Sequence, residues 1–149
     1  MVFASEEHES ATIEVMKIAD LENVLLRVAT GGRTELWHMA SGAAGFEKKH
    51  VVYSGVQGSD DDIELFDSPF RHGFVITSAR RLLVFGSNGK SQLGISAEET
   101  AVAVNAIEQP YFTGRRVFFA SCSANFTLVV TEEHNACRRL YLMGDHTKA

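Results

Sequence analysis

The chain has 149 residues, of which 45% are apolar and 22% charged, and these values are typical of one globular domain with a core. Its net charge of −5 argues against nucleic acid or an anionic membrane as the main partner, because phosphate binding needs clustered Lys and Arg. The start, MVFASEEHESATIEV, carries acids where a signal peptide has a basic segment, and no apolar run reaches the length of a membrane span. We therefore expect an intracellular protein, cytoplasmic or nuclear, with no membrane partner.

After an acidic flexible leader (residues 1–11), short runs rich in β-branched and aromatic residues predict a mainly antiparallel all-β protein. Two pairs of these runs flank turn residues and predict hairpins, around Gly31-Gly32 and around Ala79-Arg80-Arg81. In chain order, the predicted strands are Thr12–Ile18, Asn23–Ala29, Thr34–Met39, His50–Ser54, Phe74–Ser78, Leu82–Phe85, Arg116–Phe119, Phe126–Thr131 and Leu140–Met143.

One segment, Ser96–Ala106, predicts a short helix. Ser96 stands three residues before Glu99, which is the spacing of a capping box. The alternation of Val and Ala in the same segment competes with this interpretation, and a loop with a single helical turn also fits.

Internal repeats organise most of the chain. The segment LLVFGSNGKSQLG (Leu82–Gly94) is similar to LYLMGDHTKA (Leu140–Ala149) and, more weakly, to LWHMASGAAGF (Leu36–Phe46). Upstream of the first two, HGFVIT (His72–Thr77) and FTLVVT (Phe126–Thr131) match at corresponding positions. The repeats span about 12–49, 50–106 and 107–149, in one repeat domain over 12–149.

This pattern of a strand ending in Thr, a turn, and a strand followed by G-x-N and Q-L-G resembles the repeats of the RCC1 (regulator of chromosome condensation 1) family. The resemblance implies a partial β-propeller of two to three blades. It also implies structural roles for the matching residues, which are His72, Thr77, Phe85, Gly86, Asn88, Gly89, Gln92, Leu93, Gly94, Cys122, Thr127, Thr131, Tyr141 and Gly144. Ser91 departs from the pattern, since a Gly is usual there, and Phe126 stands where His is usual.

The motif residues are expected to shape the turns of the backbone and to fill the core. We expect Gly89 and Gly94 to adopt positive φ, Asn88 to tie the turn, and Leu93 to fill the seam between blades. Alternating side chains, namely Phe74, Ile76, Leu128 and Val130, are expected in the inter-blade core. The GKS run at Gly89 is not predicted to bind phosphate, because Val84 stands where a phosphate-binding loop needs its first Gly.

No residue pattern predicts a catalytic, cofactor or metal site. His72 is expected to make a buried hydrogen bond, although a hydrolase using His72 with Ser68 or Asp67 is an alternative. Cys122 is expected to be an inert buried thiol that does not pair with Cys137. The acidic run Asp60-Asp61-Asp62 is expected to be solvated, with cation binding as the alternative.

The sequence thus predicts a non-enzymatic protein-interaction module or scaffold of RCC1-like type. A propeller ring closes with about four to eight blades, so two or three blades leave an apolar flank that association would cover. The expected partner is another protein or a second copy of the chain. The resemblance also offers guanine-nucleotide exchange on a small GTPase, or a chromatin-associated regulator, as alternatives.

Overall fold

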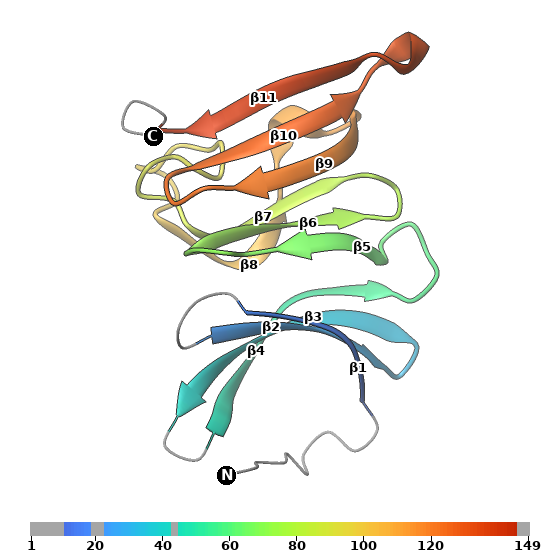
Figure 1. The fold of residues 1–149 in the computed structure, drawn as a ribbon, viewed down its shortest axis with the longest axis vertical. Helices are drawn as coiled ribbons and strands as arrows, with labels where there is room; N and C mark the ends of the chain where they lie inside the picture. The colour runs from blue at the N-terminus through green and yellow to red at the C-terminus, as the bar shows by residue number, and fades with distance from the viewer. Residues whose placement is uncertain (1–10, 19–22, 43–44, 146–149) are drawn as a thin grey trace.

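The protein is a stack of three antiparallel β-sheets, seen in a computed structural model that describes residues 11–18, 23–42 and 45–145 (Figure 1). Sheet A lies at one end of the long axis, sheet B in the middle and sheet C at the other end. Sheet A contains β1 (Thr12–Ile18), β2 (Asn23–Thr30), β3 (Arg33–Gly42) and β4 (Gly45–Val56). Sheet B contains β5 (Ile63–Asp67), β6 (His72–Thr77), β7 (Leu82–Ser87) and β8 (Val102–Glu108). Sheet C contains β9 (Arg116–Cys122), β10 (Phe126–Glu132) and β11 (Arg138–Gly144).

The prediction of a mainly antiparallel all-β protein is confirmed. In every sheet, strands adjacent in the chain are hydrogen-bonded neighbours, as in the up-and-down blade of a propeller. Each predicted strand coincides with an observed one, and both predicted hairpins are present. The prediction missed β5 and β8 and made β4 too short. The predicted leader, residues 1–11, lies almost entirely outside the described residues.

The prediction of a helix in residues 96–106 is wrong, because its second half is strand β8, paired with β7. The first half is a loop with one helical turn, closed by the N–H of Thr100 donating to the carbonyl of Ser96 at 2.9 Å. β-branched Val102 and Val104 favour the extended strand, and pairing with β7 satisfies its backbone. Only two short 3₁₀ turns, Pro110–Phe112 and His134–Ala136, occur in the described chain, and no helix there could cross a membrane.

Apolar side chains fill both junctions between sheets. The junction of sheets A and B is built around Leu25, Leu36, Val75 and Phe85. The junction of sheets B and C is larger, and its buried members are Phe74, Ile76, Leu82, Val84, Leu93, Ala103, Phe112, Val117, Ala120, Val129 and Met143. The face of sheet A that points away from sheet B carries a third buried cluster: Val24, Leu26, Val28, Trp37 and Met39.

The middle position of sheet B explains why β6 is buried at every residue, since sheet A covers one of its faces and sheet C the other. Strand β10 is buried only at alternate positions, namely Thr127, Val129 and Thr131. The expectation that Leu128 and Val130 lie in an inter-sheet core is therefore wrong, while Phe74 and Ile76 do lie in one. Leu128 and Val130 occupy the face of sheet C that points away from sheet B.

Candidate functional site

The motif residues come together at the junction of sheets B and C. The ring Nε2 of His72, at the start of β6, lies 2.9 Å from the hydroxyl oxygen of Thr127 on β10. The Thr127 hydroxyl in turn donates to the carbonyl of Gln92 at 2.8 Å. Both side chains are buried. This chain of contacts, which we call the His72–Thr127 link, joins β6, β10 and the loop after β7.

The link fixes the protonation of His72. A hydroxyl has one proton to donate, and Thr127 gives it to Gln92, so the Nε2 of His72 must donate to Thr127. Burial lowers the pKa of His72, and a backbone hydrogen bond with Phe126 acts in the opposite direction. The neutral ring protonated at Nε2 is therefore the form that fits the folded protein at neutral pH.

Asn88 organises the loop between β7 and β8, as the motif predicts. Its buried side-chain amide donates to the carbonyls of Ile95 and Thr100, at 3.1 and 2.7 Å. Its side-chain oxygen accepts from the N–H of Leu93 at 3.0 Å. These bonds hold Leu93, which is fully buried, inside the core between sheets B and C.

Gly86, Gly94 and Gly144 all adopt positive φ, at 98°, 73° and 111°. A Cβ at Gly94 would collide with the side chains of Met143 and Gln109, and one at Gly86 or Gly144 would collide with neighbouring backbone. Gly89 differs from the expectation, because it has no positive φ and open space around it. The positive φ falls instead on Ser91, at 55°, which is the position where the repeat pattern has Gly.

The two strand-ending threonines have related roles at their hairpins. The hydroxyl of Thr77 accepts from the N–H of Arg81 at 3.2 Å, and that of Thr131 donates to the carboxylate of Glu133 at 2.8 Å. Tyr141 receives a hydrogen bond from Arg115 at 3.1 Å and packs edge-to-face on Phe112. These contacts hold hairpins and strand ends together.

Gln109 belongs to the same framework, although the sequence did not single it out. It is buried, donates to the carbonyl of Gly94 at 3.0 Å, and accepts from the N–H of Tyr111 at 2.7 Å. It thereby connects the Gly94 loop to the chain that leads from sheet B to sheet C. The one sequence feature that could have indicated this role is its position directly before Pro110, where a side chain can cap the turn that follows.

The residues considered for hydrolysis do not form a triad-like arrangement. The hydroxyl of Ser68 donates to the backbone carbonyl of His72 at 3.1 Å, and the ring of His72 is fully buried against Thr127. Asp67 caps the N–H of Ser68 and lies 4.0 Å from the ammonium of Lys17. The hydroxyl of Ser68 thus makes no contact with the imidazole that would activate it, and the Thr127 hydroxyl that does contact the imidazole donates its proton to the Gln92 carbonyl.

The remaining candidates have structural partners. Burial raises the pKa of Cys122 to about 12, so this thiol is protonated at neutral pH, and both Cys122 and Cys137 are free. Asp61 pairs with Arg81, and Asp62 accepts from the N–H groups of Gly58 and Ile63. The described residues contain no group of three His, Cys, Asp or Glu that could hold a metal ion.

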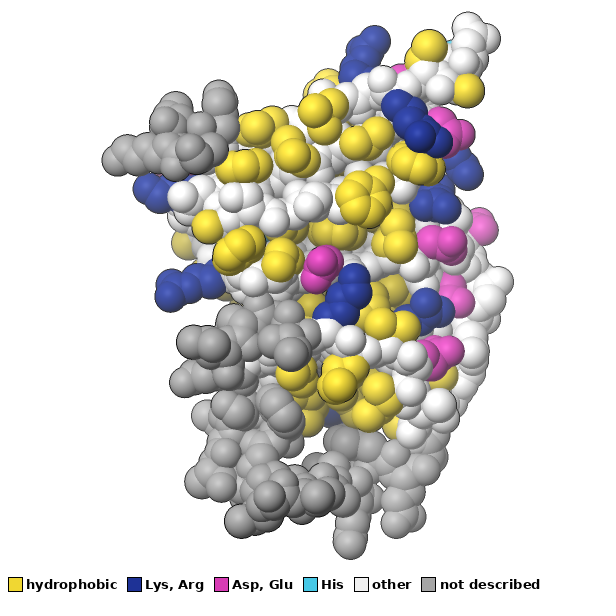
Figure 2. All heavy atoms as spheres, viewed as in Figure 1, with side chains coloured by type: hydrophobic (Ala, Val, Ile, Leu, Met, Phe, Trp, Pro, Cys, Tyr) yellow, Lys and Arg dark blue, Asp and Glu magenta, His cyan; other side chains and the backbone are white. Residues whose placement is uncertain are grey.

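An apolar surface lies on the face of sheet C that points away from sheet B. We call it the end face, and it comprises Phe119, Leu128, Val130, Leu140 and Leu142. Leu140 and Leu142 are 64% and 43% exposed. Leu140 and Leu142 lie four and two residues before Gly144, and the equivalent positions before Gly86 are Leu82 and Val84, which are 1% and 0% exposed. Figure 2 shows hydrophobic side chains at the surface over β9–β11.

Charged side chains lie at one end of this surface. Arg116 and Glu132 approach to 3.7 Å, and the guanidinium of Arg138 stacks 3.8 Å from the ring centre of Phe118. The centre of the end face carries no charged residue. This arrangement of an apolar centre and a polar margin is typical of a protein-binding surface.

Comparison with known proteins shows a likeness of fold. No family model matches the chain, and no curated protein matches it either. Among solved structures, the chain is similar to human WBSCR16, an RCC1-like protein, with a TM-score of 0.61 at 9% sequence identity. The match covers 97% of this chain and 37% of WBSCR16, so the chain spans little more than a third of that protein's length. At this identity the likeness shows a shared fold.

We predict that Gly94→Ala lowers the free energy of unfolding by about 1–3 kcal/mol, because the backbone has positive φ and the methyl group must displace the side chains of Met143 and Gln109. Gly89→Ala is the matched control five residues away and should change it by no more than about 0.5 kcal/mol. Urea unfolding of both variants measures the difference. Equal losses would contradict the distinction drawn between the two glycines.

We also predict that stability falls as the pH drops below the ordinary pKa of histidine. Because the pKa of folded His72 is lowered, the unfolded chain takes up its proton first, so acid favours unfolding. Urea midpoints measured from pH 7.5 to 5.5 should fall for the wild type and fall less steeply for His72→Gln. An unchanged slope in His72→Gln would refute this role.

Proposed function

We propose that this chain is a non-enzymatic protein-interaction module of RCC1-like type, and that its end face binds the same face of a second copy. The likeness of its fold to WBSCR16 and the repeat motif support the RCC1-like assignment. The buried, hydrogen-bonded state of His72 supports a structural role for the motif.

One observation carries the proposal, and it is a comparison of equivalent positions in sheets B and C. In sheet B, Phe74, Ile76, Leu82 and Val84 form the face that packs against the next sheet. The repeat equivalents in sheet C are Leu128, Val130, Leu140 and Leu142, which make up most of the end face. These side chains are of the size and kind that pack against a sheet in this fold, and no described sheet covers them.

A second copy fits this surface without electrostatic conflict. The end face has an apolar centre, so two such centres can pack together without burying a charge. In a two-fold arrangement with the strand directions reversed, the margin with Arg116 and Arg138 of one copy lies over the margin at Phe126 and Gly144 of the other, which Asp145 adjoins. A charged centre would have excluded this arrangement.

The size of the end face sets the expected strength of association. Strands β9–β11 have seven residues each, which gives a face of roughly 14 by 24 Å at ordinary strand spacing and rise. Packing two such faces buries an area at the low end of specific interfaces, so we expect a dissociation constant on the order of 10–100 μM.

We predict that the mass measured by light scattering rises from one copy to two over this concentration range. Leu142→Glu places a carboxylate in the centre of the end face and should keep the protein monomeric, because a buried unpaired charge costs several kcal/mol. Leu142 is 43% exposed, so the fold should survive, which circular dichroism checks.

Met16→Glu on β1 is the matched control, because Met16 is 65% exposed and lies on sheet A, at the other end of the stack. This variant should dimerise like the wild type. A wild-type protein that stays monomeric well above this range, or a dimer that Leu142→Glu leaves intact, would refute self-association through the end face.

A further inference from the structure

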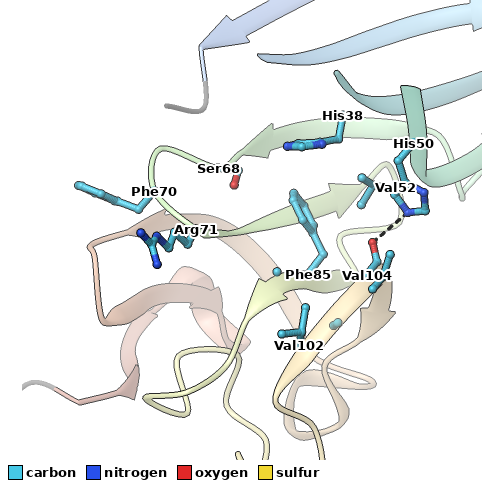
Figure 3. A pocket seen from close by; sticks show the side chains of 11 residues that line it. His38, His50, Val52, Ser68, Phe70, Arg71, Phe85, Val102 and Val104 are labelled. Carbon is cyan, nitrogen blue, oxygen red and sulfur yellow. Dashed lines mark hydrogen bonds between the residues drawn. The ribbon is translucent and has the colours of Figure 1, made fainter. Parts of the chain in front are cut away.

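A second feature, independent of the proposed function, is an open cleft of about 440 Å³ between sheets A and B. It lies beside the contact of their last strands, where Nε2 of His50 on β4 approaches the carbonyl of Val104 at 3.1 Å and the side-chain oxygen of Asn105 at 2.9 Å on β8. Figure 3 shows His50 at one end of the cleft, Arg71 and Phe70 at the other, and Phe85 between them. The volume is in the range of small-molecule sites.

The walls of the cleft are mainly apolar and only partly covered. Phe85 forms a buried wall, whereas Phe70, Val102 and Val104 are 46%, 58% and 63% exposed. Three large apolar side chains at solvent around one hollow would lose much of that exposure when an apolar ligand enters. A flat aromatic body could contact Phe85 and Val104 together.

The polar groups of the cleft favour an anion. Arg71 lies in its lining with the imidazoles of His38 and His50, and no Asp or Glu is among its described lining residues. Within the described residues, Arg71 makes no ion pair with a carboxylate. Its backbone is held in place, because its carbonyl accepts from the N–H of Ser87 at 2.9 Å. An unpaired guanidinium on a fixed backbone next to apolar walls is suited to a carboxylate attached to an apolar body.

We propose that this cleft binds a small organic anion with an aromatic or apolar body, with its carboxylate at Arg71 and its body extending along Phe85 toward Val104. The guanidinium supplies two parallel N–H donors for a carboxylate. The proposal goes beyond the end face, because the cleft lies at the other junction of the stack and involves none of the end-face residues.

The test is a titration of the full chain with 2-naphthoate, followed by amide chemical shifts in NMR. We expect saturable shifts at residues 68–71, 102–104 and His50, with a dissociation constant of about 1 mM or tighter for a ligand of this size. The neutral isostere 2-naphthalenemethanol should bind at least about fivefold more weakly, as loss of one charge-assisted contact implies.

Two variants test the assignment. Arg71→Gln should weaken 2-naphthoate about fivefold or more, and Val104→Asp should abolish binding by placing a carboxylate in the cleft at an exposed position. Arg116→Gln, at the margin of sheet C, is the matched control and should leave binding unchanged. The proposal is overturned if 2-naphthoate gives no saturable shifts, if Arg71→Gln and Val104→Asp both bind it like the wild type, or if the shifts map to the end face.

Discussion

The His72–Thr127 link is the contact on which the arrangement of sheets B and C depends. It lies in a core of apolar side chains, where an unpaired polar group would cost about 1–3 kcal/mol. The Nε2 of His72, the Thr127 hydroxyl and the Gln92 carbonyl can be satisfied together only when β6, β10 and the loop after β7 have one relative position. Apolar packing around Leu93 supplies most of the driving force, but it tolerates sliding, and the directional hydrogen bonds do not.

The same repeat has different surroundings in the three sheets, and the proposed function rests on this difference. Both faces of sheet B are covered, and the outward face of sheet A carries buried Val24, Leu26 and Trp37. On sheet C, Leu140 and Leu142 occupy positions equivalent to buried ones but lie exposed. Positions that are buried in the core in sheet B are thus exposed in sheet C, and this exposed apolar face is the one that we propose binds a second copy.

Much of this could be predicted from local sequence patterns. Strand-forming runs and hairpin turns gave most strands, and the repeat motif located His72, Asn88, Leu93 and Gly94, because turns and caps depend on nearby residues. The face that β10 buries was predicted wrongly, since the apolar pattern of Leu128 and Val130 marks a face suited to burial and does not say whether a sheet covers it. Strand β8 was missed because the capping-box spacing of Ser96 and Glu99 is a local pattern that favours a helix. The pairing of β8 with β7, which makes the segment a strand, joins residues that are distant in the sequence.

The cleft could not be predicted, because Arg71, His50 and Val104 lie far apart in the sequence and meet only when sheets A and B pack. The same limit applies to the partner of His72, which is 55 residues away. The motif predicts a buried hydrogen bond for this histidine, but the partner, Thr127, lies beside it only when β10 packs against β6. Long-range polar contacts between sheets are therefore the part of this fold that sequence patterns specify least.

The most direct test of this account is the coupling free energy between His72 and Thr127, measured by urea unfolding of His72→Phe, Thr127→Val and the double variant. If the link aligns sheets B and C, Thr127→Val leaves the buried Nε2–H of His72 without an acceptor, a cost that is absent once His72 is Phe. The double variant should therefore cost less than the sum of the single variants by about 1 kcal/mol or more. Losses that add to within about 0.3 kcal/mol would show that the two side chains act independently, and would contradict the account.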